Sequence, residues 1–121
     1  MEEARNDYAE ALKIYRELAQ KNPDVYLPKI ALALNNLGLL DRDQNRMEEA
    51  GREFAEALQT YRELAQKNPD VYWPDVAEML NNLGLLDRDQ KRMEEARNEI
   101  AEALKIRREL AQKNPMSICL K

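Results

Sequence analysis

A 46-residue internal repeat constrains this chain more than any other feature of its sequence. The segment Tyr15–Tyr26 recurs as Tyr61–Tyr72. Residues 1–46 and 47–92 are identical at 34 of 46 positions, and residues 93–115 begin a third copy. A period of this length is typical of repeat arrays, in which each unit buries its apolar face against the next unit. The repeat therefore predicts a solenoid.

Within each period the apolar residues have helical spacing. In the second copy they recur at steps of three and four along residues 50–65, which is one stripe of a helix. Asn22-Pro23-Asp24 and its copy read as helix ends, with Asp24 as a possible N-cap of the next helix. Pro28 fits only in a first helical turn, so the next helix should become regular near it. We expect five helices over about residues 2–21, 26–42, 46–67, 72–88 and 92–113.

These elements predict one all-α domain. Only three glycines and five prolines interrupt the chain, and β-branched residues are scarce, which favours helices over a sheet. Short links make consecutive helices antiparallel neighbours, so the expected fold is an αα-hairpin solenoid. The repeats 1–46 and 47–92 and the partial repeat 93–115 form the domain 1–115, and a tail follows at 116–121.

Charge and cysteine content indicate the setting of the protein. The net charge is −4 with both signs interspersed, so no basic patch points to nucleic acid or to anionic lipid. No apolar run approaches the length of a membrane span, and the first residues do not resemble a signal peptide. The single cysteine, Cys119, cannot form an internal disulfide. We expect a cytoplasmic protein without nucleic-acid or membrane partners.

The sequence offers no set of residues for catalysis. It contains no histidine and no cysteine pair, which removes the commonest general base and the usual zinc ligands. Its glycines are isolated within helical patterns rather than gathered in a phosphate-binding loop. Acid pairs such as Glu48-Glu49 stand in first helical turns, where they complement the helix dipole. The chain is predicted to be non-enzymatic, without cofactor or metal.

A family resemblance appears in the residues that would pack two helices together. Small residues stand where the helices would cross and large ones between them, at Leu34, Leu37, Gly38, Ala50, Phe54 and Ala57. This pattern resembles the tetratricopeptide repeat, and the long period resembles the extended repeats of kinesin light chains. The resemblance implies a superhelix whose concave face is lined by the first helix of each pair. It also implies a scaffold that binds a peptide or a protein segment.

Two positions depart from the family pattern. Asp41 and its copy stand where the family usually has an aromatic residue. One reading makes each aspartate a helix-end acid paired with a neighbouring arginine, from among Arg42, Arg46, Arg88 and Arg92. The other places the carboxylate between the helices, where either an arginine reaches it or the stack opens and favours exchange of helices between chains. Asn45 and Lys91 replace the usual turn glycine. Because lysine adopts a left-handed backbone poorly, residues 85–113 could also continue as one helix.

The resemblance places six residues in the ligand groove. They lie on a face of the first helix of each pair that differs from the packing face: Asn35, Leu39, Arg42, Asn81, Leu85 and Arg88. An asparagine there could bond the backbone of an extended peptide through both ends of its amide. The alternative is that these residues are merely solvated copies of one another. Leucines occupy the position of the asparagine that chaperone-tail-binding members use, so that specific function is not expected.

Self-association is the second function that the sequence leaves open. The first predicted helix carries Tyr8, Leu12 and Tyr15, but the helix that would cover part of this face is missing. Uncovered apolar edges favour contact between copies, so we expect a homo-oligomer through edge pairing or domain swapping. The near-identical repeats also fit an excised fragment or an engineered array. The two functions differ in whether the groove stays free.

Overall fold

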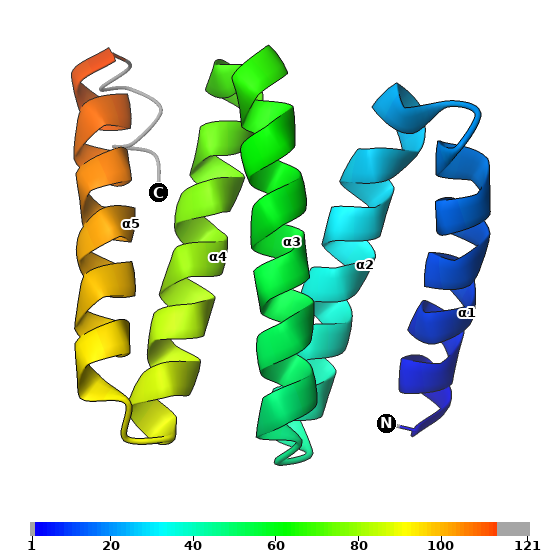
Figure 1. Cartoon of the computed structure of the whole chain (residues 1–121), viewed down its shortest axis with the longest axis horizontal. Coiled ribbons are helices and arrows are strands. Elements are labelled where there is room, and N and C mark those ends of the chain that lie inside the picture. Colours follow the sequence, from blue (N-terminus) through cyan, green and yellow to red (C-terminus); the bar gives the residue numbers. More distant parts are fainter. Residues whose placement is uncertain (1, 114–121) are drawn as a thin grey trace.

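Five antiparallel α-helices make up the described part of the chain, residues 2–113, in a computed structural model (Figure 1). Their bounds are α1 Glu2–Ala19, α2 Pro23–Asp43, α3 Met47–Lys67, α4 Pro69–Asp89 and α5 Met93–Lys113. Residues 2–113 contain no strand, so the predicted all-α fold with five helices is confirmed. The predicted tail at 116–121, with Cys119, lies outside the described residues.

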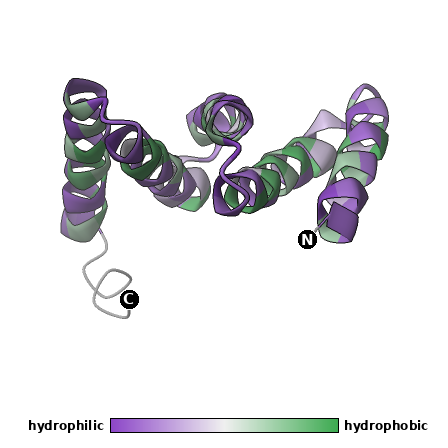
Figure 2. Cartoon of the chain, turned by 90° about the horizontal axis from the view of Figure 1, so that it is seen from below, coloured by the Kyte–Doolittle hydropathy of each residue, from purple (hydrophilic) through white to green (hydrophobic). Residues whose placement is uncertain are grey.

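The helices form a short arch with two layers. In Figure 2, α3 lies at the crest, α2 and α4 lie on its inner side, and α1 and α5 lie at the two ends. The outer layer consists of α1, α3 and α5, and ion pairs link these helices. Arg16 Nη1 of α1 lies 2.7 Å from Glu56 Oε2 of α3, and Arg62 Nη2 of α3 lies 3.0 Å from Glu102 Oε2 of α5. The second pair is the first one moved by one repeat. The stacking is therefore regular, as the predicted αα-hairpin solenoid requires.

The turn between α2 and α3 closes with a Schellman motif. Asn45 adopts a left-handed backbone with φ of 64°. The Arg46 N–H donates to the Asp41 carbonyl at 2.7 Å, and the Asn45 N–H donates to the Arg42 carbonyl at 3.0 Å. These two bonds satisfy carbonyl groups that the end of a helix would otherwise leave unpaired.

The turn between α4 and α5 repeats this geometry with a less suitable residue. Lys91 has φ of 63°, and the Arg92 N–H donates to the Asp87 carbonyl at 2.7 Å. A left-handed backbone costs a residue with a Cβ about 1–2 kcal/mol. The packing of α5 against α4 outweighs that cost, because it buries Ala96 and Ala103 of α5. One continuous helix over residues 85–113 was therefore a wrong alternative.

The prolines begin the inner helices earlier than the sequence predicted. α2 starts at Pro23, with Asn22 before it as an N-cap that makes no side-chain bond. Proline suits the first helical position, because its missing N–H has no partner inside the helix. The prediction that Asp24 caps this helix is wrong: it lies in the first turn, where its charge complements the helix dipole. Pro28 lies inside the helix rather than near its start.

The core lies between the layers and depends on one close contact. Phe54 of α3 is fully buried against α2, and a Cβ on Gly38 would lie only 2.6 Å from its Cε1 atom. Glycine therefore lets the two helices approach around the ring. All six residues of the recognised pattern are buried: Leu34, Leu37, Gly38, Ala50, Phe54 and Ala57.

Candidate binding surface

The two inner helices touch each other directly through polar side chains. Asn82 Nδ2 of α4 donates to Asn35 Oδ1 of α2 at 3.1 Å, and Arg42 Nη2 lies 3.8 Å from Asp89 Oδ2. The α3 helix separates α2 from α4 in the sequence, yet these contacts join them side by side. They identify the flanks along which neighbouring inner helices meet.

Beside these contacts, apolar side chains form a line along α2. Val25, Leu32 and Leu39 follow one another at steps of seven, which places them on one side of the helix. Leu32 is 54% exposed and Leu39 is 36% exposed. The same line on α4 begins with exposed Val71. We call these equivalent positions together the inner face: Val25, Leu32, Leu39, Val71, Glu78 and Leu85.

The three groove residues predicted on α2 have different environments. Leu39 is exposed on the inner face. Asn35 is buried and its amide oxygen accepts the bond from Asn82, so that oxygen already has a partner. Arg42 is half-buried and pairs with Asp89. The structure thus gives Asn35 and Arg42 a role in joining the repeats.

The three groove residues predicted on α4 are more accessible as a group. Arg88 is exposed, with its Nη2 atom 3.7 Å from Asp89 Oδ1. Asn81 and Leu85 are half-buried. Asn81 and Arg88 correspond to the flank of α2 that contacts α4, so on α4 this flank points away from α2.

Sequence reasoning missed Leu32, Asn82 and Asp89. The predicted groove residues of the two helices are exactly one repeat apart, whereas the observed amide contact joins Asn82 to Asn35, which are 47 residues apart. Two equivalent helices lying side by side meet through opposite flanks, so the residues in contact occupy different repeat positions. The adjacent asparagines Asn81-Asn82 could have indicated this contact, because two consecutive helical residues place one amide on each flank of α4.

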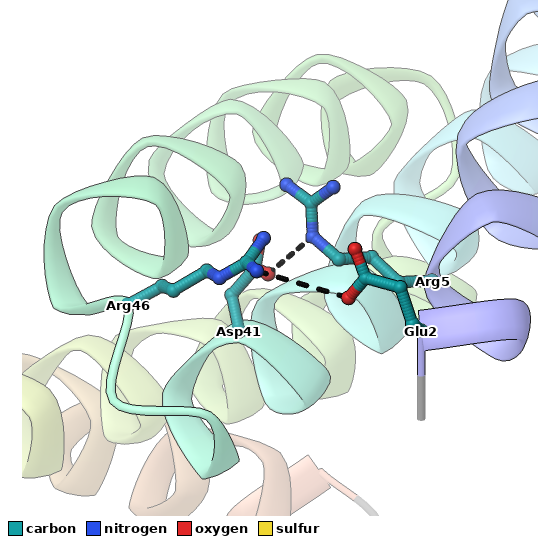
Figure 3. A network of polar contacts seen from close by, with 4 residues as sticks. All are labelled: Glu2, Arg5, Asp41 and Arg46. Carbon is teal, nitrogen blue, oxygen red and sulfur yellow. Dashed lines mark hydrogen bonds and ion pairs between the residues drawn. The ribbon is translucent and has the colours of Figure 1, made fainter.

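A buried acid stands between α1 and α2. The Asp41 side chain is fully buried, and the Arg5 Nε atom donates to its Oδ1 at 2.6 Å (Figure 3). Burial alone would raise the pKa of Asp41, but hydrogen bonds from Arg5 and Glu53 lower it below its usual value. Burial and the bond to Asp41 raise the pKa of Glu53 to about 8. Glu53 is therefore protonated at neutral pH and can act as the donor.

The arginine partner of Asp41 differs from the predicted ones. The sequence suggested Arg42 or Arg46, which stand close along the chain. The bond comes instead from Arg5 of α1, while Arg46 Nη2 lies 3.7 Å from Glu2 Oε1. Arg5 is far away in sequence, and only the packing of α1 on α2 brings it close. Because an arginine reaches this acid, the predicted loosening of the stack does not occur there.

The second repeat keeps the acids but lacks that arginine. Asp87 is 8% exposed, and burial together with a bond to Asp87 raises the pKa of Glu99 to about 8. The arginine nearest to Asp87 is Arg92, at 3.8 Å, as the sequence predicted. Gly51 occupies the position that corresponds to Arg5 in the first repeat.

The predicted self-association edge is only partly exposed. Leu12 and Tyr15 pack against the core, and the Tyr15 ring stacks on Tyr26 with centroids 6.2 Å apart. Tyr8 is half-buried. The prominent apolar side chain on α1 is instead Ile14, which is 49% exposed. Tyr stacking thus joins consecutive helices within the chain.

Within residues 2–113, no group of three or more acidic, histidine or cysteine side chains is arranged to hold a metal ion. None of the described helices combines the length and apolar character that crossing a bilayer requires.

Comparison with known families places the fold. The sequence model described as tetratricopeptide repeat matches residues 29–109, which is more than half of the chain. No curated protein matches the sequence of this chain significantly. The closer resemblance to kinesin light chain repeats stays a prediction. The arch of helix pairs, the close contact at Gly38 and this match agree, and the chain belongs to the tetratricopeptide repeat family.

Proposed function

We propose that this protein is a non-enzymatic scaffold that binds an extended peptide segment of a partner along its inner face. Tetratricopeptide repeats generally mediate protein–protein interaction. The observation that carries the proposal is the exposure of Leu32 and Leu39, two turns apart on the same line of α2. Neighbouring exposed leucines on the inner side of a solenoid suit the apolar side chains of a ligand.

Charge differences between the two inner helices suggest the chemistry of that ligand. Lys29 and Leu32 of α2 are replaced by Asp75 and Glu78 in the equivalent positions of α4. A peptide lying across both helices would meet apolar side chains on α2 and the exposed Glu78 carboxylate on α4. We infer a segment with apolar anchors at one end and a basic residue at the other. On α4, Asn81 and Arg88 add polar groups for its backbone.

A peptide display library provides the test. Peptides selected on the wild-type protein should bind Leu32→Glu/Leu39→Glu at least about tenfold more weakly, because the charges remove the apolar contact. Ile14→Glu on α1 is the matched control, since it changes an equally exposed apolar residue elsewhere. Glu78→Lys should shift the selection from basic to acidic peptides. Binding that survives the leucine substitutions and fails in the α1 control would refute the proposal.

Self-association is the alternative function, and the terminal helices favour it. Ile14 and Leu18 on α1 and Leu104 on α5 are exposed apolar side chains. Within residues 2–113, α1 packs mainly on α2, and α5 packs mainly on α4. Pairing of these edges, with Tyr8 beside them, would join copies of the chain. Light scattering over a concentration series tests this alternative. A mass that stays at 14.1 kDa excludes it, whereas a larger mass that Ile14→Glu abolishes supports it.

A further inference from the structure

A cleft of about 430 Å³ opens between the N-terminal part of α3 and the C-terminal part of α4, beside the turn to α5. Gly51 lies in its wall, and Asp87 lies across from it. We call it the Gly51 cleft, and the lining residues that matter below are Glu48, Gly51, Arg52, Leu86, Asp87 and Arg92. None of these residues belongs to the inner face, so the cleft is separate from the proposed peptide-binding surface.

In the first repeat, a side chain of this protein occupies the equivalent place. Arg5 of α1 is the counterpart of Gly51, and its guanidinium reaches Asp41, the counterpart of Asp87 (Figure 3). The second repeat keeps the buried carboxylate but lacks the arginine. The cleft is thus located where the first repeat holds a guanidinium group.

Helix geometry does not explain a glycine at position 51. The residue lies inside α3, where glycine is less favourable than alanine, and its φ is not positive. A Cβ there would meet only Leu86 Cδ2 at 3.5 Å, which is an ordinary contact. At Gly38, by contrast, a Cβ would lie 2.6 Å from Phe54. Gly51 is therefore not required for packing, and its main structural effect is to leave the cleft open.

The charges around the cleft leave Asp87 weakly paired. Its ion pair among the described residues is with Arg92 at 3.8 Å, and the Arg92 side chain is 59% exposed. Arg5 lies at 2.6 Å from the corresponding acid. Glu99 also bonds the Asp87 carboxylate, as Glu53 bonds Asp41, while its buried Oε1 atom has no hydrogen-bond partner among the described residues. Glu48 adds a negative charge at the cleft.

We propose that the Gly51 cleft binds a guanidinium group, the head group of arginine, from a molecule other than this chain. The guanidinium would bond Asp87 as Arg5 bonds Asp41, because its planar set of donors matches a carboxylate. Arg52 and Arg92 also face the cleft and oppose a second positive charge. The ligand is therefore a single arginine-like group with a neutral or acidic neighbour, rather than a polybasic segment.

The test is an NMR titration of the whole chain with N-ethylguanidinium, with ethylammonium at equal ionic strength as the control ligand. Saturable shifts should appear at the backbone amides of Gly51 and Asp87. They should be about tenfold weaker or more with ethylammonium, which lacks the planar donors. Gly51→Arg should abolish them by filling the cleft, whereas Gly51→Ala should retain them. Shifts that do not saturate, or that persist in Gly51→Arg, overturn the proposal.

The first repeat provides a second test in the opposite direction. Arg5→Gly should open a second, equivalent cleft at Asp41, so that N-ethylguanidinium binds at two places. The ligand should then raise the melting temperature of this variant more than that of the wild type. Shifts at Gly51 alone would contradict the assignment. If Arg5→Gly does not fold, the comparison of Gly51→Arg with Gly51→Ala decides the matter.

A third titration identifies the source of the guanidinium. The probe is a short peptide with one arginine among uncharged residues. Binding about tenfold tighter than that of N-ethylguanidinium assigns the site to a protein partner. Equal or weaker binding assigns it to a free guanidinium compound. Both results uphold the site, and failure of both ligands to bind overturns it.

Discussion

The two aspartates that follow the inner-helix leucines, Asp41 and Asp87, are surrounded by nearly the same sequence but by different charges. Asp41 is fully buried and bonds Arg5 at 2.6 Å, whereas Asp87 is slightly exposed and lies 3.8 Å from Arg92. Identity at 34 of 46 positions does not make two repeats equivalent. Where the first repeat has Arg5 and a closed ion pair, the second has Gly51 and an open cleft.

The comparison also shows how a carboxylate can stand in a position that is usually aromatic. An aromatic ring gains from burial, whereas an isolated carboxylate loses its hydration. The first repeat compensates Asp41 with Arg5 and with a protonated Glu53. The second repeat retains the protonated Glu99 but lacks the close arginine. Its acid is slightly exposed, whereas Asp41 is fully buried.

The largest effect should come from removing the buried ion pair. Arg5→Ala should reduce the free energy of unfolding by about 3 kcal/mol, because it leaves Asp41 buried beside Glu53 without its cation. Arg92→Ala, which removes the looser partner of Asp87, should cost below about 1 kcal/mol. Urea denaturation of both variants measures the difference. Equal losses would mean that the two repeats pair their acids alike.

The glycines of the two repeats should respond differently to alanine. Gly38→Ala should destabilise by about 2 kcal/mol, because the fully buried Phe54 ring has no room to move. Gly84→Ala should cost less, since Ile100, which it would meet, is partly exposed and can shift. Gly51→Ala should stabilise by about 0.5 kcal/mol through helix propensity. Thermal unfolding orders the three, and a loss at Gly51 would contradict the structure of the cleft.

The protonated glutamates should make stability depend on pH. Their pKa values near 8 in the folded protein exceed the ordinary 4.5, so the folded state holds protons that the unfolded state releases. Their contribution is complete below about pH 4.5 and is lost as pH rises toward 8; we expect about 1–2 kcal/mol in total because both side chains are partly exposed. Glu53→Gln/Glu99→Gln should flatten the decline between pH 5 and 8.

The opposite titration of Asp41 does not interfere in that range. Its pKa is lowered from 3.8, so its contribution is present above that value and is lost only in stronger acid. Denaturation curves at pH 5, 6, 7 and 8 therefore report on the glutamates. A double variant with the slope of the wild type would show that other groups cause the decline.

The smallest expected effect concerns the two left-handed turns. Lys91→Gly should stabilise by about 1 kcal/mol, because glycine adopts a φ of 63° without the Cβ penalty. Asn45→Gly should change stability by less, since asparagine tolerates this conformation better than lysine. Chemical denaturation of both variants provides the measurement. A larger gain at Asn45 would reverse the ranking of the two turns.

Much of the fold could be predicted from the repeat and its spacing. Helical periodicity and the packing pattern around Gly38 and Phe54 gave the helices and their family, because burial of one apolar stripe is encoded locally. The helix starts were less accurate. Pro23 was interpreted as a residue that ends a helix, whereas it is the first residue of α2. A short link leaves both interpretations consistent with the same residues.

The binding surface was predicted only in outline. Its placement on the inner helices remains a prediction, and Leu39 is exposed there. Asn35 and Arg42, however, contact α4, and Leu32 was not among the predicted groove residues. Periodicity indicates which side of a helix packs on its partner in the hairpin. It does not indicate which flank meets the equivalent helix of the next repeat.

The sequence by itself determined the helices, their pairing and the family, since these depend on local spacing repeated along the chain. Only the tertiary structure decided the partner of Asp41, the geometry at Lys91 and the cleft beside Gly51. Each of these depends on residues far apart in sequence or on packing energies that outweigh local preference. The sequence shows that Arg5 is replaced by Gly51 in the second repeat. Only the packing of the neighbouring helix shows that this position lies beside a buried aspartate.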